Sequence, residues 1–193
     1  MNVRKPILTG LLGIASLAPC KAQNPVQFFS EVGVTGVVTK NNLFYGGMNM
    51  GINAGKNYTN LYAGVTLNQK KQAGITGLVF NNYSWNKNLS SWARDVVSTS
   101  GNTLEVAPVK ATLKAGKFDF SVAPAYTLYN DFESGKTTQG INFISQTVYS
   151  INNKNKIFFE GKYMTEPSNK LTNTRFGKFK DNFSYMCSYL YYF

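Results

Sequence analysis

Apolar and polar residues alternate along most of this 193-residue chain, and a two-residue period is the signature of β-strands. In residues 118–128, for example, Phe118, Phe120 and Val122 share one phase, while an aspartate, a serine and an alanine occupy the other. Further segments show the same pattern, among them 59–68, 141–151 and 183–193. Successive side chains of a strand point to opposite faces, so each of these segments would have one apolar face. The sequence therefore predicts an all-β protein.

Short polar clusters rich in Asn, Gly and Lys separate these segments. We predict ten strands, at 26–40, 43–54, 58–68, 72–81, 83–93, 103–115, 117–130, 140–152, 156–165 and 176–193. An even number of antiparallel strands suits an up-and-down barrel. The segment 83–93 alternates poorly, so eight strands, with 81–102 partly looped, is the alternative.

The predicted short turns all fall at one end of such a barrel, and the predicted long loops all fall at the other. With both termini at one end, that end holds the short turns 55–57, 81–82, 115–117 and 152–155. The other end then holds the longer polar stretches 94–102, 131–139 and 166–174. Short turns on the periplasmic side and longer loops outside are expected of bacterial membrane barrels.

Two prolines interrupt predicted strands, because each lacks the N–H that a sheet needs. Pro108 and Pro124 would face each other across a hairpin centred on Gly116. We therefore expect a bulge or a local break at this point.

The distribution of charge indicates which face meets the solvent. Only 15% of the residues are charged, against roughly 25% in soluble proteins. The apolar faces hold no charged residue and the polar faces hold mainly amides and hydroxyls, while many lysines fall at turns: Lys40, Lys56, Lys70, Lys71, Lys117, Lys136, Lys154 and Lys156. This distribution predicts a transmembrane antiparallel barrel with its apolar face toward lipid. Val122→Arg or Phe143→Arg should then impair assembly more than Asn142→Arg. A soluble exported barrel, apolar inside, is the alternative.

The N-terminus has the features of a signal peptide. Arg4 and Lys5 precede a short apolar stretch, and small residues flank a cleavage point after Ala22. We predict a signal peptide at 1–22 and a barrel domain at 23–193. The sequence before Cys20 also resembles a bacterial lipoprotein box, so lipidation of Cys20 is an alternative.

The last strand carries a more specific pattern, in which aromatic residues alternate up to the final Phe193, with Tyr189 and Tyr191 in the same phase. This segment resembles the C-terminal signature of Gram-negative outer-membrane β-barrel proteins, and no narrower family is identified. The resemblance implies an outer-membrane location, contact with outer-membrane lipids, and recognition of Tyr189, Tyr191 and Phe193 by the barrel-assembly machinery.

The composition argues against several kinds of chemistry. There is no histidine, which removes the commonest general base and metal ligand. The nine acidic residues are scattered, and only Asp131 and Glu133 lie close together, in a predicted loop. The net charge of +11, which falls to +8 when Arg4, Lys5 and Lys21 leave with the signal peptide, comes from residues that form no basic stripe. We therefore predict no enzyme, cofactor or metal site and no nucleic-acid partner.

A few charged residues fall on the lumen-facing phase of their strands. These are Glu31, Asp119, Glu160 and Lys162. Because unpaired buried charges are costly, we expect them to pair, either as a structural plug or along a gated pore. The favoured function is a structural, adhesive or surface-interaction role carried by the outer loops, with an unknown extracellular partner. The alternatives are a narrow, porin-like channel for small solutes and a soluble periplasmic barrel that binds an apolar ligand.

Overall fold

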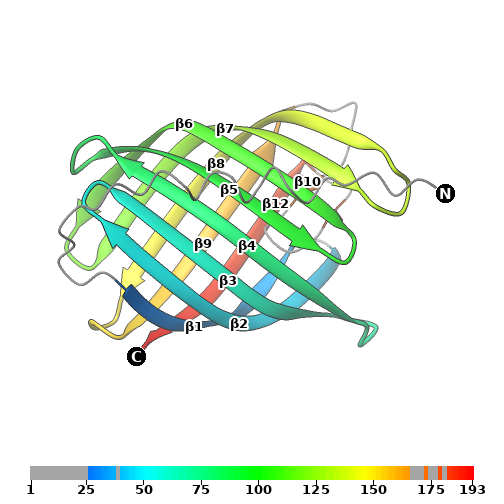
Figure 1. Cartoon of the computed structure of the whole chain (residues 1–193), viewed down its shortest axis with the longest axis horizontal. Helices are drawn as coiled ribbons and strands as arrows, with labels where there is room; N and C mark the ends of the chain where they lie inside the picture. Colours follow the sequence, from blue (N-terminus) through cyan, green and yellow to red (C-terminus); the bar gives the residue numbers. More distant parts are fainter. Residues whose placement is uncertain (1–25, 38–39, 166–171, 174–177, 180–181) are drawn as a thin grey trace.

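In a computed structural model, the chain forms a closed antiparallel β-barrel (Figure 1). The structure describes residues 26–37, 40–165, 172–173, 178–179 and 182–193. The predicted signal peptide, Cys20 and most of the predicted loop 166–174 lie outside these residues. No helix of the described part is long and apolar enough to cross a membrane.

Ten strands make up the barrel, as predicted, and the eight-stranded alternative is wrong. They are β1 (Val26–Val37), β2 (Lys40–Ala54), β3 (Asn57–Asn68), β4 (Ala73–Ser84), β5 (Leu89–Ser98), β6 (Gly101–Ala115), β7 (Phe118–Asp131), β8 (Thr137–Ser150), β9 (Asn155–Met164) and β12 (Phe183–Tyr192). Each strand pairs with its neighbours, and β1 pairs with β12 through contacts such as Val32 opposite Tyr189. This pairing closes the barrel. Between β9 and β12, the short β10 (Thr172–Asn173) and β11 (Lys178–Phe179) form a separate two-stranded sheet.

The connections define two ends of the barrel. At the end that we call the turn end lie Val26, Phe193 and the turns 55–56, 85–88, 116–117 and 151–154. In two of these turns Gly55 and Gly116 have a φ of 62°, a left-handed conformation that favours glycine. The opposite end, which we call the loop end, holds the connections 69–72, 99–100 and 132–136 and the segment between β9 and β12.

Two predicted connections are wrong. The predicted turn at 81–82 lies inside β4, and the actual turn at 85–88 is closed by Asn86, whose side chain accepts hydrogen bonds from two following backbone N–H groups. The predicted long loop 94–102 is instead the end of β5 and the start of β6, joined at 99–100. The predicted loop 131–139 is shorter than expected, because only 132–136 separate β7 from β8.

The predicted irregularity at the prolines is confirmed. The register of β6 against β7 shifts between Val106 and Ala111, and its register against β5 shifts in the same region, so β6 contains one extra residue. A single extra residue reverses the facing of everything after it. Glu105 faces the lumen before the bulge, and Lys110 lines the lumen after it. The bulge therefore turns Lys110 away from lipid.

The facing of the side chains agrees with a membrane barrel. Val122, Phe143 and Tyr189 are 61%, 56% and 41% exposed on the outer surface, whereas Asn142 is fully buried. A soluble barrel would require the reverse facing, so that alternative does not fit. Asp95 is an exception on the outward phase of β5, where the side chain of Asn102 hydrogen-bonds to it.

Tyrosine rings pack on glycines inside the barrel. A Cβ atom added to Gly47 would lie 2.7 Å from the Tyr62 ring and against the backbone oxygen of Ala63. Only glycine allows the two strands and the ring to approach so closely.

We expect Gly47→Ala to lower the free energy of unfolding by about 1–2 kcal/mol, because the new methyl group meets backbone that cannot move aside. The matched control is Gly77→Ala, where the nearest atom to the new Cβ would be 3.8 Å away and little change is expected. Urea unfolding in phospholipid vesicles measures both. Equal stability of the two variants would contradict the close packing.

Candidate functional site

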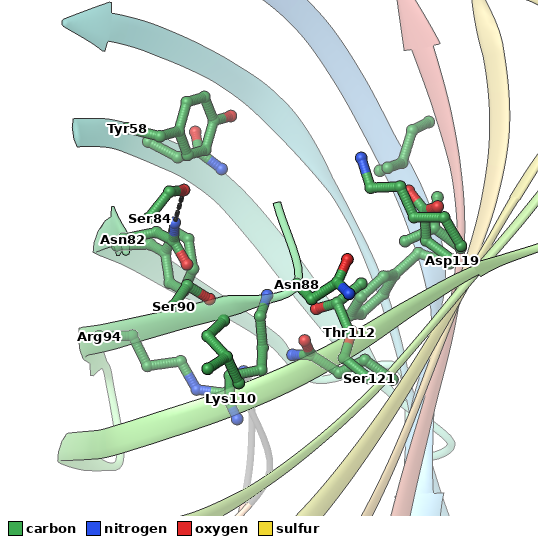
Figure 2. A pocket seen from close by; sticks show the side chains of 18 of the residues that line it. Tyr58, Asn82, Ser84, Asn88, Ser90, Arg94, Lys110, Thr112, Asp119 and Ser121 are labelled. Carbon is green, nitrogen blue, oxygen red and sulfur yellow. Dashed lines mark hydrogen bonds between the residues drawn. The ribbon is translucent and has the colours of Figure 1, made fainter. Parts of the chain in front are cut away.

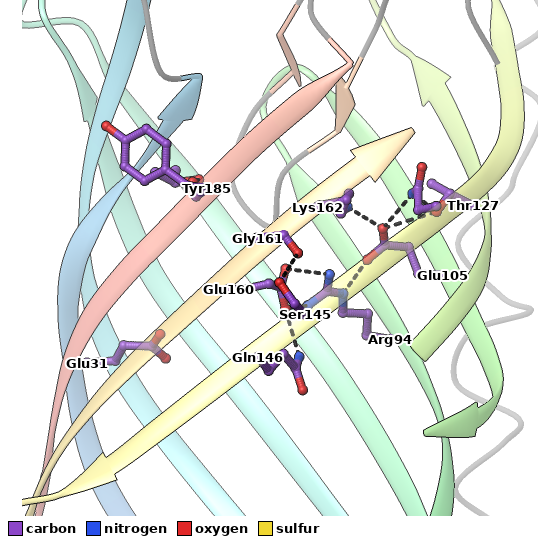
Figure 3. Close-up of polar contacts among 12 residues, drawn as sticks. Glu31, Arg94, Glu105, Thr127, Ser145, Gln146, Glu160, Gly161, Lys162 and Tyr185 are labelled. Carbon is purple, nitrogen blue, oxygen red and sulfur yellow. Dashed lines mark hydrogen bonds and ion pairs between the residues drawn. The ribbon is translucent and has the colours of Figure 1, made fainter. Parts of the chain in front are cut away.

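The lumen is crossed by an ion pair between β5 and β9 (Figure 3). Around the barrel these strands are separated by three strands on one side and five on the other, so they lie on nearly opposite walls. Arg94 of β5 donates from both terminal nitrogens to the two carboxylate oxygens of Glu160, at 2.8 Å each. Such bidentate pairs are among the strongest and best oriented of ionic hydrogen bonds.

Two further charged residues complete the network. Glu105 of β6 binds Arg94 through one carboxylate oxygen and Lys162 of β9 through the other. Two cations therefore meet two anions, and the four side chains are at most 3% exposed. We call Arg94, Glu105, Glu160 and Lys162 the lumen network.

Neutral polar side chains occupy the remaining hydrogen-bonding positions. Gln146 of β8 donates to Glu160 at 2.8 Å, and Thr127 of β7 donates to Glu105 at 3.1 Å. Asn142 donates to the same Glu105 oxygen at 3.3 Å. Buried charges are tolerated when they are both paired and hydrogen-bonded. The network is thus a neutral structure that joins β5, β6, β7, β8 and β9.

Strand geometry explains how these residues meet. Arg94 and Glu105 are directly opposite each other in the β5–β6 pairing. Glu160 and Lys162 are two residues apart on β9, so both point inward. In β5 the inward positions also include Trp92, and the Arg94 guanidinium lies 5.0 Å from the centre of its ring. This contact supports the arginine from one side.

The structure brings together only part of the predicted charge cluster. Glu160 and Lys162 do lie in one network, but Glu31 and Asp119 do not belong to it. Glu31 of β1 is 1% exposed and accepts hydrogen bonds from Tyr45 at 3.4 Å and Asn49 at 3.3 Å. Asp119 lies farther toward the turn end, opposite Lys114 in the β6–β7 pairing.

Sequence reasoning missed Arg94 and Glu105. Arg94 falls in the predicted loop 94–102, and Glu105 falls in the predicted strand 103–115 without a pattern that marks it as a site residue. A signal for Arg94 was present, because Ser90, Trp92, Arg94 and Val96 share one phase and all are buried in the structure.

On the turn-end side of the network, the lumen contains a cavity of about 380 Å³ (Figure 2). Arg94 and Gln146 lie at its inner boundary. Its lining combines lysines with aromatic and aliphatic side chains from strands on both sides of the barrel. We call this space the turn-end cavity.

An apolar cluster fills another part of the lumen. It consists of Tyr45, Tyr62, Leu78, Val96 and Met186. Each of these residues is at most 5% exposed, so the cluster and the lumen network together occupy much of the barrel interior. Among the described residues, no group of acidic or cysteine side chains is arranged to hold a metal ion.

The three predicted assembly-signal residues lie at the end of the chain nearest the turn end. Tyr189 is exposed on the outer surface and donates from its hydroxyl to Asn155. Tyr191 and Phe193 make an edge-to-face contact with ring centres 5.4 Å apart. The backbone N–H of Phe193 reaches the Phe28 carbonyl at 3.2 Å. Recognition of these residues during assembly stays a prediction.

No family model and no curated protein matches the sequence. Several solved structures do match over most of the chain. A de novo designed transmembrane β-barrel aligns with 89% of this chain and 98% of its own, at 11% identity and a TM-score of 0.41. A bacterial polysaccharide outer-membrane secretin aligns with 89% of this chain at 7% identity and a TM-score of 0.44. A loop-deletion variant of the outer-membrane protein OmpT of Vibrio cholerae aligns with 90%, at 11% identity and a TM-score of 0.36.

These similarities concern the fold alone. The chain covers 66% of the length of the secretin and 60% of the length of the OmpT variant. The closed barrel of this chain follows from its own strand pairing and from the facing of its side chains. The strand pairing and the outward facing of the apolar side chains identify the chain as a transmembrane β-barrel, and no narrower family is shown.

Proposed function

We propose that this chain is a non-enzymatic barrel of a Gram-negative outer membrane, with a closed lumen and a structural or surface-interaction role. The lumen network is the observation that carries this proposal. The ion pair from Arg94 to Glu160 spans the interior, and the packed cluster around Tyr62 and Met186 narrows it further. An open diffusion pore would need a continuous water-filled path, and a barrel of this size has little space to spare.

The cellular setting is part of the same proposal. The apolar side chains exposed on the outer surface, such as Val122, Phe143 and Tyr189, support contact with outer-membrane lipids. The predicted signal peptide at 1–22 would export the chain, and the terminal aromatic strand would be read by the barrel-assembly machinery. Fractionation with outer membranes, together with heat-modifiable migration on gels, tests this setting.

A surface-interaction role would use the loop end, because the turn end faces the periplasm in this orientation. The segment 94–102 offers no loop for recognition, because it belongs to β5 and β6 apart from the two connecting residues 99–100. Residues 132–136 and the connection between β9 and β12 are the remaining candidates. Loops on a rigid scaffold commonly carry recognition.

We expect the purified protein to give no steady conductance in planar lipid bilayers, because the network blocks the lumen. Replacing Arg94 and Glu160 together by serine removes the blocking side chains while preserving charge balance, and we expect conductance steps from that variant. Lys114→Ser, in the turn-end cavity but outside the network, is the control and should remain silent. Regular open steps from the unmodified protein would contradict the closed lumen.

A narrow, gated channel is the second candidate. The observation in its favour is that the turn-end cavity extends inward as far as Arg94. Rearrangement of the lumen network would then open a path from the cavity. Conductance that appears in the unmodified protein only at high voltage would favour this candidate.

A further inference from the structure

We propose that the turn-end cavity binds a small amphipathic anion: a molecule with an apolar ring or short chain and one sulfonate, carboxylate or phosphate group. Its volume of about 380 Å³ falls within the range of small-molecule sites, roughly 300–1,000 Å³. This inference goes beyond the proposed closed barrel, because it assigns ligand binding to part of the lumen.

One wall of the cavity is polar and basic, as Figure 2 shows around Lys110 and Arg94. Lys110 is half-buried, and hydroxyl groups of Ser90, Thr112 and Ser121 line the same cavity. Hydroxyl and ammonium groups are the donors that an anionic oxygen requires. This wall therefore provides a place for a negatively charged headgroup.

The charge of Lys110 is not cancelled by a close partner. Among the described residues, no carboxylate lies within 4.0 Å of its ammonium group, and Glu105 and Glu160 are engaged by Arg94 and Lys162. The bulge at Pro108 turns this lysine into the cavity instead of toward lipid. Lysine in a partly buried setting without an ion pair is costly, and an anionic ligand would remove that cost.

The overall charge of the lining also favours an anion. Lys87, Lys110 and Lys114 line the cavity, as does Asp119, which lies opposite Lys114 in the β6–β7 pairing and also attracts Lys110. Glu31 also contributes to the lining, but it is 1% exposed and already accepts hydrogen bonds from the side chains around it. Ammonium groups therefore outnumber the accessible carboxylates.

Apolar side chains from other strands also line the cavity, beside further polar groups such as Asn60 and Asn82. Phe29 of β1, Phe80 of β4, Phe158 of β9 and Leu190 of β12 all line it. These side chains would bury the hydrocarbon part of a ligand, and each square ångström of apolar surface removed from water stabilises the complex. An inorganic anion alone would leave this wall uncovered.

Isothermal titration calorimetry on the full barrel in non-ionic detergent tests the proposal, with 2-naphthalenesulfonate as the probe and a detergent-only blank. We expect binding of the sulfonate, and much weaker binding of the neutral analogue 2-naphthalenemethanol. Lys110→Met should weaken sulfonate binding roughly ten- to hundredfold, because it removes a charge-assisted hydrogen bond. Lys56→Met, on a turn at the same end but outside the cavity lining, is the matched control and should bind as the unmodified protein does.

Heat-modifiable migration on gels checks that each variant is folded. Equal binding of the neutral and anionic probes would overturn the proposal, as would unchanged sulfonate binding by folded Lys110→Met. Absence of measurable sulfonate binding to the unmodified barrel would also overturn it. Conductance measurements are separate from these outcomes, since a closed barrel can bind the probe or fail to bind it.

Discussion

Phe143→Arg is expected to destabilise the folded barrel by about 2–4 kcal/mol, because it places a charge in the hydrocarbon region of the bilayer. Phe143 is 56% exposed on the outer surface and lies near the middle of β8. Its partners on the neighbouring strands, Pro124 and Tyr163, also face outward. An arginine at this position therefore has no lumen water within reach. Equilibrium urea unfolding in phospholipid vesicles measures the loss.

The control for this variant must place the same arginine on the lumen side. Asn142→Arg is a poor choice in the structure, because Asn142 is fully buried against Glu105 and Thr127. Ser121→Arg is better, since Ser121 lines the turn-end cavity, where a guanidinium can remain hydrated. We expect Ser121→Arg to cost much less than Phe143→Arg. If both variants lost the same stability, the assignment of an outer lipid-facing surface would be wrong.

The strands that sequence predicts best have unbroken alternation between clear turns. The strand predicted at 117–130 is β7, Phe118–Asp131, because alternation continues along its whole length and Gly116 marks the preceding turn. The inward facing of Glu160 and Lys162 followed from the same phase argument. Local pattern is sufficient here, because both the facing and the turn are local properties.

Prediction failed where a local signal conflicted with a distant interaction. Arg94 and Asp95 are adjacent charges, and after two valines the chain continues with Ser-Thr-Ser-Gly, a composition typical of a loop. In the barrel, Arg94 is stabilised in a strand by Glu160, which is 66 residues away. No local pattern contains that partner. The strand order and register that bring them together must be known first.

The turn at 85–88 was missed for a different reason. The pair Asn81–Asn82 looks like a turn, but in the structure Asn81 accepts a hydrogen bond from Thr59 and Asn82 lines the cavity. The Asn82 amide nitrogen also donates to Ser84 at 3.3 Å, so each of the two side chains makes a hydrogen bond within a strand. The actual turn depends on Asn86, whose side chain closes it. Asparagine is compatible with both settings, so its presence alone does not distinguish them.

The lumen network provides the second large effect. We expect Arg94→Met to lower the free energy of unfolding by about 3–5 kcal/mol, because it leaves Glu160 buried without its bidentate partner. After this change, two carboxylates share the single ammonium of Lys162. Adding Glu160→Gln should restore most of the lost stability, since Glu105 and Lys162 then remain as a balanced pair. The double variant is thus expected to be more stable than Arg94→Met alone.

A double-mutant cycle measures this coupling directly. The four proteins are the unmodified barrel, Arg94→Met, Glu160→Gln and the double variant, each unfolded by urea in the same vesicles. Lys114→Met is the control for loss of a lumen cation outside the network, and it should change stability little because Lys114 is exposed in the cavity. Additive losses in the cycle would mean that Arg94 and Glu160 do not interact across the lumen. In that case only Glu105, Lys162 and the packed apolar cluster would fill the lumen, and the proposal of a closed lumen would lose its main support.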